Sequence, residues 1–359
     1  MAEIETLMGV DAGDIEKIMG VEKDDIEKIM GLEVPSGPAW VGARGILWAR
    51  AESGTAGDDT ILYRTIGAAS GNASDFGDMN AAGSSGGTIS SGTRGVHGGG
   101  YYNPSSTNWY GTDKIEYITI ASTGNGTDFG NLHETGYYGQ GASSNGTLGT
   151  IFGGMWTPRN YINSITIASA GDASDVGDLT VARGDIAGVC SATMSIHGGG
   201  NKFGLSNEIA YTSWGSLGAA SDFGDLTVTG TRRTSGEDSS RGIFYGAYTS
   251  NTPNTTDNID YIGTASTGNA SDFGNTLSLA YHSSWGSDLG GTHEGAGMSN
   301  GVRLDVGGGR TEGSSGYAET AKLQYITIQS AGDAGDYSDD IDDWGGDGAS
   351  AGVQGTSGN

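Results

Sequence analysis

The stretch from Ile259 to Asn275, which reads IDYIGTASTGNASDFGN, decides the fold of this chain. Its first residues alternate β-branched or aromatic side chains with polar ones, and a period of two is typical of a half-buried strand. It ends in an Asp-Phe-Gly-Asn motif, which we interpret as a turn stabilised by its leading aspartate. The stretch therefore predicts a strand followed by a well-defined turn.

The same combination occurs six times along the chain. Related motifs begin at Asp75, Asp128, Asp175, Asp222, Asp272 and, in a degraded form, Asp336. An alternating stretch precedes each motif, at residues 61–66, 115–120, 162–167, 209–214, 259–264 and 323–328. A repeat of about 50 residues with several strands is the size of a propeller blade. One blade cannot bury both of its faces, whereas six blades around an axis can, so we predict an all-β, six-bladed propeller.

A second type of strand, which ends in glycines, lies upstream of most alternating stretches. Its clearest copies are residues 96–100, 151–154, 196–200 and 306–309, with weaker counterparts at residues 45–48 and 242–245. Glycine makes up 68 of the 359 residues, whereas proline contributes only 5, which excludes a collagen-like chain. This glycine content also argues against a helical solenoid.

The charge of the chain restricts its partners. With 43 acidic and 17 basic residues the formal net charge is −26, which would repel both a nucleic-acid backbone and an anionic membrane. The first residues are acidic where a signal peptide would be basic, and no apolar run reaches 18 residues, so we expect neither a cleaved signal nor membrane insertion. The single cysteine, Cys190, is expected to be a small core residue.

The N-terminal segment repeats every eleven residues. Its apolar positions fall at i, i+3 and i+4, on one face of three short helices, and they are Ile4, Leu7, Met8, Ile15, Ile18, Met19, Ile26, Ile29 and Met30. Helices this short are unstable alone in water, so this apolar stripe must pack against something. We expect it to dock on another protein; the alternative is that it folds back on the propeller as a cap.

These patterns divide the chain into four parts. We expect an anchor at residues 1–34, a linker at 35–38, the propeller at 39–345 and a Gly/Ser-rich tail at 346–359. How the ring closes stays open at this point, because residues 341–344 could complete either the last blade or the first.

Two resemblances cover these repeats. The order Ala182-Arg183, then residues 192–200 ending in His197-Gly198-Gly199-Gly200, then residues 207–211 resembles a kelch repeat, although the tryptophan expected in the fourth kelch strand is replaced by the Asp-Phe-Gly-Asp type of motif. The glycine-rich repeats and units such as residues 25–31 are similar to structural proteins of tailed bacteriophages, of the cyanophage type. The second resemblance implies a virion appendage or decoration protein, located in the virion and bound to capsid or tail proteins.

The sequence shows little that points to catalysis. The Asp-x-Gly motifs resemble the Asp-box of sialidase-type propellers, where such boxes are structural, and the arginines Arg183, Arg232, Arg233, Arg241, Arg303 and Arg310 follow no recognisable sialidase pattern. We therefore expect no enzyme and no cofactor; a sialidase-like glycosidase is the weaker alternative. Asp172, Asp175 and Asp178 offer oxygen ligands for a structural calcium ion, with turn stabilisation as the simpler interpretation.

Aromatic side chains between the strands are the better candidates for ligand contacts, because a rigid scaffold usually presents its binding groups on loops. The candidates are Tyr101, Tyr102, Trp109, Tyr110, Tyr137, Tyr138, Trp156, Tyr248, Tyr281 and Trp285. They could hold a host-surface glycan or protein, or they could fill gaps between blades. A free carbohydrate-binding propeller lectin is accordingly the main alternative to a phage particle protein.

Overall fold

The fold is described from a computed structural model of the full chain. The structure describes residues 44–48, 59–67, 73–80, 86–102, 110–134, 139–155, 159–201, 204–250, 255–277, 295–313, 316–319, 322–340 and 355–358, together with four two-residue strands near the N-terminus. The chain divides into two units, Met1–Ser36 and Gly37–Asn359, which are considered separately.

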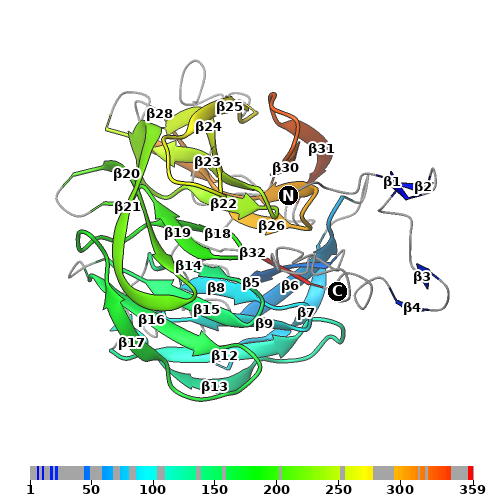
Figure 1. The fold of residues 1–359 in the computed structure, drawn as a ribbon, viewed down its shortest axis with the longest axis vertical. Helices are drawn as coiled ribbons and strands as arrows, with labels where there is room; N and C mark the ends of the chain where they lie inside the picture. The colour runs from blue at the N-terminus through cyan, green and yellow to red at the C-terminus, as the bar shows by residue number, and fades with distance from the viewer. Residues whose placement is uncertain are drawn as a thin grey trace. The chain divides into compact units, whose positions relative to one another are not determined.

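The second unit is a ring of six four-stranded antiparallel blades, so the predicted all-β, six-bladed propeller is confirmed (Figure 1). The innermost strands are β8 (Gly87–Ser90), β14 (Gly141–Ser144), β18 (Ala187–Cys190), β22 (Thr234–Glu237), β26 (Ala296–Ser299) and β32 (Gly355–Gly358). The second strands are β5 (Arg44–Trp48), β9 (Arg94–Gly98), β15 (Leu148–Phe152), β19 (Met194–Gly198), β23 (Arg241–Tyr248) and β27 (Arg303–Gly307).

The third strands correspond to the six predicted alternating stretches. They are β6 (Thr60–Thr65), β12 (Lys114–Thr119), β16 (Tyr161–Thr166), β20 (Ser206–Ser213), β24 (Thr255–Gly263) and β30 (Lys322–Thr327). The outermost strands are β7 (Ser74–Asp78), β13 (Thr127–Asn131), β17 (Ser174–Asp178), β21 (Ser216–Gly230), β25 (Ser271–Asn275) and β31 (Gly335–Asp340). Two small hairpins extend the second and sixth blades: β10 (Tyr101–Tyr102) with β11 (Tyr110–Gly111), and β28 (Arg310–Gly313) with β29 (Gly316–Glu319).

The ring is closed by the end of the chain. Strand β32 pairs antiparallel with β5, with Thr356 opposite Ile46, and so supplies the innermost strand of the first blade. Part of the segment expected to be a tail is therefore a blade strand. Blades are numbered in chain order from this first blade, β32-β5-β6-β7, to the sixth, β26-β27-β30-β31.

The first unit leaves one prediction open. Within residues 1–34 the structure describes the strands β1 (Thr6–Leu7), β2 (Val10–Asp11), β3 (Lys17–Ile18) and β4 (Val21–Glu22), paired β1 with β2 and β3 with β4. The rest of this segment and all nine docking side chains lie outside the described residues. The helical repeats and their docking role accordingly stay predictions.

The Asp-aromatic-Gly motif is a β-bulge in the outermost strand, not the turn that the sequence analysis expected. In the fifth blade Ile259 pairs with Gly274 and the next residue, Asp260, pairs with Asp272, so Phe273 is the extra residue of the bulge. The register shifts at the same place in each of the first five blades. The bulge turns Phe273 into the core, where it is 3% exposed, because an inserted residue re-aims the side chain.

The bulge also holds neighbouring blades together. Gly274 has a φ of 149°, and a side chain there would overlap the backbone of Gly332 in the next blade. Gly332 N donates to Phe273 O at 2.7 Å, and the amide of Asn275 donates to the carboxylate of Asp333 at 2.9 Å. We call this arrangement the outer clasp.

In the outer clasps of four blade pairs, the backbone N of one residue donates to the side chain of a residue in the next blade, and the two residues are always one Asp and one Asn. They are Asp78 with Asn125, Asn131 with Asp172, Asp225 with Asn269, and Asn275 with Asp333. An Asp–Asp pair would place two negative charges together, so this alternation avoids repulsion in a strongly acidic chain.

A buried polar residue on the third strand makes a second recurrent link between blades. The side chain of Asp260 accepts hydrogen bonds from the backbone N of Thr227 at 3.0 Å and from its hydroxyl at 2.5 Å. The residues in equivalent positions of blades 2, 3 and 6 accept the backbone N–H at the end of the preceding blade in the same way; they are Glu116, Asn163 and Gln324. These side chains satisfy backbone groups that burial would otherwise leave unpaired.

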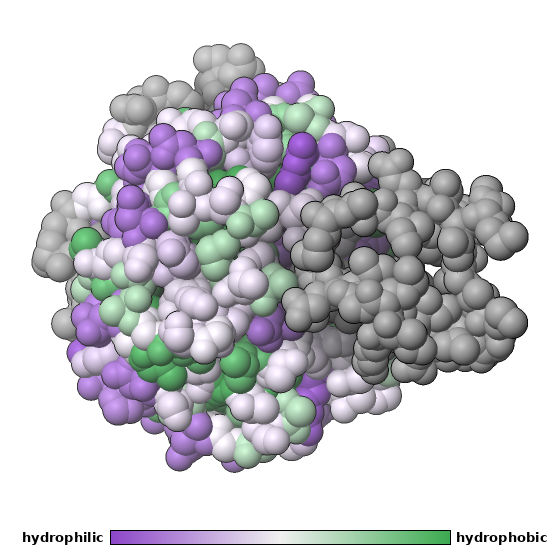
Figure 2. Space-filling view, in the orientation of Figure 1, coloured by the Kyte–Doolittle hydropathy of each residue, from purple (hydrophilic) through white to green (hydrophobic). Residues whose placement is uncertain are grey.

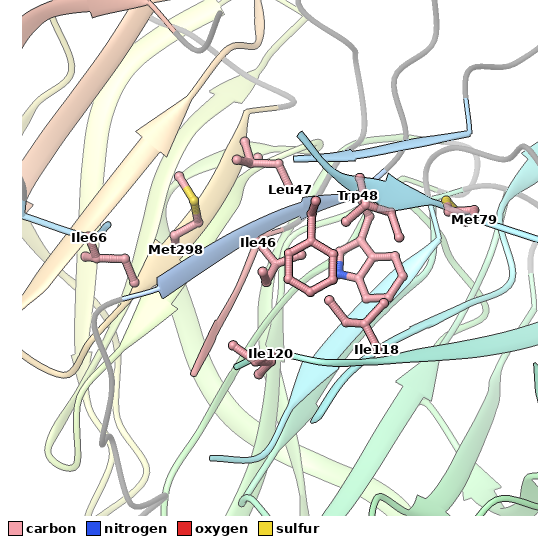
Figure 3. Packing of buried hydrophobic residues seen from close by; sticks show 11 residues of the cluster. Ile46, Leu47, Trp48, Ile66, Met79, Ile118, Ile120 and Met298 are labelled. Carbon is pink, nitrogen blue, oxygen red and sulfur yellow. The ribbon is translucent and has the colours of Figure 1, made fainter. Parts of the chain in front are cut away.

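The hydrophobic core lies between the blades. Figure 3 shows Ile46, Leu47 and Trp48 of the first blade between residues of its two neighbours: Ile118 and Ile120 of the second blade, and Met298 of the sixth. The close approach of the blades near the axis explains the glycine content of the innermost strands, because a side chain at Gly188 would overlap the backbone of Ala142. On the face shown in Figure 2 hydrophilic residues occur in separate groups, in agreement with acidity spread through repeats.

Candidate functional site: the mouth face of the propeller

The two ends of the blades carry different kinds of connection. We call the end where second strands finish and innermost strands begin the mouth face, and the opposite end the turn face. On the turn face the innermost and second strands are joined by residues 91–93, 145–147, 191–193, 238–240 and 300–302. On the mouth face the connections vary widely, from residues 231–233 between β21 and β22 to residues 276–295 between β25 and β26.

The turn face uses its polar side chains to shape its own turns. Asn145 Oδ1, for example, accepts hydrogen bonds from the backbone N of Thr147 at 3.0 Å and of Leu148 at 2.8 Å. The other four turns have the same arrangement around Ser91, Ser191, Asp238 and Asn300. These side chains replace a backbone turn partner, so the recurrent chemistry of this face is structural.

All ten aromatic candidates belong to segments of the mouth face, as judged by the strands that flank them. Tyr110, in the β10–β11 hairpin, is 48% exposed. Tyr248, at the mouth end of β23, lies under the guanidinium of Arg232, which is 5.6 Å from its ring centre. The side chains of the other eight lie outside the described residues, so their contact with a ligand stays a prediction.

Three consecutive blade connections meet around the axis at the mouth face. Asp185 N donates to Gly139 O at 2.6 Å, and Arg232 N donates to Asp185 O at 3.0 Å, so each connection is tied to the one before it. Gly139 has a φ of 76°, whereas Asp185 and Arg232 hold similar positive angles of 52° and 59° without being glycines. Such angles are unfavourable for a long side chain, and backbone strain of about 1–3 kcal/mol per residue tends to be kept at functional sites.

The strained residues form an ion pair. Arg232 Nε donates to Asp185 Oδ2 at 3.1 Å, and the Asp185 carboxylate lies where a side chain on Gly139 would be. Burial raises the pKa of Asp185, while Arg232 opposes this shift. The pair fixes a positive and a negative charge at the opening of the ring.

Two connections between blades on this face carry arginines. Arg183, Arg232 and Arg233 all lie in mouth-face connections of blades 3 to 5, whereas Arg241 and Arg303 begin second strands at the turn face. The turn-face arginines cover aromatic rings of their own blades; Arg241, for example, lies 4.6 Å from the centre of the Tyr261 ring. Sequence reasoning missed this division, because it depends on the end of the blade at which each arginine lies.

The repeated histidines are packing residues of the second strands. His97 stacks on Trp48 of the preceding blade at 5.7 Å, and His197 packs on Phe152 at 5.0 Å between ring centres. Burial lowers the pKa of His97 to about 4 and that of His197 well below its ordinary value, the latter with a contribution from Arg183. Both are therefore neutral at neutral pH, which suits side chains that fill the space between blades.

The proposed calcium ligands take part in blade contacts. Asp172 accepts hydrogen bonds from Asn131 N at 2.9 Å and Nδ2 at 3.1 Å, and Asp175 accepts one from Gly177 N at 3.2 Å. In the part of the chain that the structure describes, no three His, Cys, Asp or Glu side chains are grouped as a metal site would require. The geometry of Asp172 and Asp175 is that of structural carboxylates.

Cys190 lies beside the only acidic residue of the described innermost strands. Its thiol donates to Ser144 O at 2.9 Å and is 3.5 Å from Glu237 Oε1. Burial raises the pKa of Glu237 to about 8 and also raises that of the Cys190 thiol. As expected, Cys190 is fully buried in the core.

Comparison with known proteins adds no relative. No protein-family model matches the chain, and no curated protein sequence matches it. Among the described residues there is also no helix long and apolar enough to span a membrane.

Proposed function

We propose that this protein is a structural protein of a tailed-phage particle, held in the particle by residues 1–34 and presenting its propeller for host adhesion or particle stabilisation. The observation that carries the proposal is the difference between the two faces. Recurrent turns close one face, while the irregular connections, the aromatic candidates and the strained ion pair Asp185–Arg232 all belong to the other. A rigid ring with one variable face suits a binding role.

The remaining parts of the proposal come from the sequence. The eleven-residue repeats supply an apolar stripe that needs a protein partner, and the glycine-rich repeats resemble phage structural proteins. The proposed partners are capsid or tail proteins, and a glycan or protein of the host surface. The net charge of −26 supports neither nucleic acid nor an anionic membrane as a partner. The use of the repeated Asp, His and Arg side chains in blade packing supports a binding role over a catalytic one.

Deletion of residues 1–34 tests this proposal. We expect the truncated protein to keep the β-rich circular dichroism spectrum of the propeller and to be missing from purified particles assembled in its presence. Substitution of Met8, Met19 and Met30 by Ser should have the same effect with the chain length unchanged. Particles that incorporate both variants at the wild-type level would refute the anchor.

The second candidate is a free propeller lectin. It is favoured by the aromatic candidates on the mouth face, of which Tyr110 is the most exposed among those described. Native mass measurement separates the two candidates, because a lectin would occur without a larger partner and would bind glycans as the isolated full chain.

A further inference from the structure

Arg183 is buried with one edge of its guanidinium group unused. The side chain is 2% exposed, and only Nη1 has partners: Ser206 Oγ at 3.0 Å and Glu208 Oε2 at 3.4 Å. Nε and Nη2 have no hydrogen-bond partner among the described residues. These two nitrogens form the planar edge that binds a carboxylate with two parallel hydrogen bonds.

Such an edge is costly to leave empty. A buried donor without an acceptor loses its hydrogen bonds to water without replacement, and the cost is larger when the donor is charged. Elsewhere in the propeller, buried polar side chains such as Asp260 and Gln324 accept hydrogen bonds from single backbone N–H groups of the preceding blade. Two donors of one buried arginine without a partner among the described residues point to an acceptor that those residues do not include.

The guanidinium lies close to the surface of the mouth face. Its partners Ser206 and Glu208 are half-buried, and Glu208 keeps 27% of its side chain exposed. Thr180, which is exposed, donates its hydroxyl to the other oxygen of Glu208. Glu208 thus links the buried guanidinium of Arg183 to the surface of the mouth face.

A second unpaired polar atom lies in the same region. His197 Nε2 is buried without a partner among the described residues, and the charge of Arg183 contributes to the lowered pKa of this histidine. The Cδ of Arg183 is 3.3 Å from the position that a side chain on Gly200 would take, three residues after His197. Arg183 and His197 therefore offer three free polar atoms from two neighbouring segments.

We propose that the free edge of Arg183 binds the carboxylate of an acidic sugar that reaches the mouth face between blades 3 and 4. This inference rests on the proposed binding role of that face, and names its ligand class. A planar carboxylate matches the two parallel donors, and the neutral His197 can contribute a further hydrogen bond. A sugar is the ligand class of the lectin alternative, for which the exposed Tyr110 on the same face is a described aromatic candidate.

The charge balance selects a carboxylate over a phosphate. Glu208 already offsets the single charge of Arg183 in part, and the chain as a whole carries −26. Beside Glu208, a ligand with two negative charges would therefore meet stronger repulsion than a ligand with one.

Binding of D-glucuronate to the full-length protein, measured by isothermal titration calorimetry at low salt, tests the inference, with D-glucose as the neutral counterpart. We expect wild type to bind D-glucuronate at least ten-fold more tightly than D-glucose. Arg183→Lys keeps the charge but loses the planar edge, so affinity for the acid should fall at least ten-fold. Arg241→Lys is the control, because Arg241 lies at the turn face and should leave binding unchanged.

Glu208→Gln separates ligand binding from a purely structural role. Removal of the competing carboxylate should raise the affinity for D-glucuronate by about five-fold, as expected for loss of one partly exposed charge near the ligand. A structural Arg183–Glu208 pair predicts lower stability and no gain in affinity.

Three results would overturn the inference: equal affinities for D-glucuronate and D-glucose, equal affinities of wild type and Arg183→Lys, or a crystal structure with D-glucuronate that shows only water at Nε and Nη2. None of these results bears on the proposed anchoring by residues 1–34, because incorporation into particles does not depend on the binding of D-glucuronate. Loss of incorporation on deleting residues 1–34 would in turn support the particle role whatever Arg183 binds.

Discussion

The outer clasp makes a quantitative prediction about charge. In the clasp between blades 5 and 6, Asn275 N donates to Asp333 Oδ1 at 2.9 Å and Asn275 Nδ2 donates to the same oxygen at 3.2 Å. Asn275→Asp removes the second hydrogen bond, worth about 1 kcal/mol, and replaces its donor by a second carboxylate. Two exposed charges about 4 Å apart repel by about 1 kcal/mol in water. We therefore expect Asn275→Asp to lower the free energy of unfolding by about 2 kcal/mol.

Exchange of the two residues should restore the clasp. Asn275→Asp combined with Asp333→Asn recreates the Asp–Asn order found between Asp78 and Asn125, so at least half of the lost stability should return. Urea unfolding at pH 7 of the wild type, both single variants and the double variant gives the coupling energy, which we expect to exceed about 1 kcal/mol. Additive effects of the two substitutions would refute the assignment of the clasp.

The clasp between blades 2 and 3 provides an internal control. Its geometry matches, with Asn131 Nδ2 donating to Asp172 at 3.1 Å, but Lys114 Nζ also donates to Asn131 Oδ1 at 2.9 Å. The lysine would neutralise part of a new carboxylate at position 131. Asn131→Asp should accordingly destabilise less than Asn275→Asp, and the difference should vanish in 1 M salt, where exposed charges are screened.

Three further predictions follow from the blade contacts. Gly274→Ala should lower the free energy of unfolding by about 3 kcal/mol, because the new side chain would overlap the backbone of Gly332. Gly332 has a similar φ but open space around it, so Gly332→Ala should lower the free energy of unfolding by about 1 kcal/mol; thermal unfolding of both variants measures the difference. The pKa of Glu237 is raised to about 8, so above about pH 5 the folded state holds a proton that the unfolded chain has lost, and the free energy of unfolding should fall between about pH 5 and pH 8. Glu237→Gln should remove this part of the pH dependence, and an unchanged pH profile of the variant would contradict the prediction. Arg232→Gly relieves the backbone strain of a φ of 59° but removes the ion pair with Asp185, so the free energy of unfolding should change by less than about 1 kcal/mol. The affinity of the mouth face for any ligand should fall.

The architecture could be predicted because its signals are local. The alternation in residues 259–264 and the motif at Asp272 recur along the chain, and a repeat of this size that needs neighbours to bury its faces has few solutions. The error over the motif has an equally local cause. A glycine with positive φ after an Asp suits a turn and a bulge alike, and only the pairing of Ile259 with Gly274 distinguishes them.

The contacts that could not be predicted join distant residues. Asn275 and Asp333 meet across a blade boundary, and Arg183 meets Ser206 and Glu208 across another. Strand β32 could not be predicted from the sequence for a different reason. This closing strand contains only Gly, Thr and Ser, so it has the composition of a tail.

Internal repetition separates structural from functional residues in this protein. A side chain that returns at the same place in several blades, such as the clasp Asp and Asn, has a role that every blade boundary needs, and its partner is found in the ring. Asp185, Arg232 and Arg183 break this rule: two hold backbone angles that their counterpart Gly139 holds without strain, and the third keeps two donors unpaired among the described residues. They lie on the one face whose connections differ from blade to blade, as the proposed ligand-binding role of that face predicts.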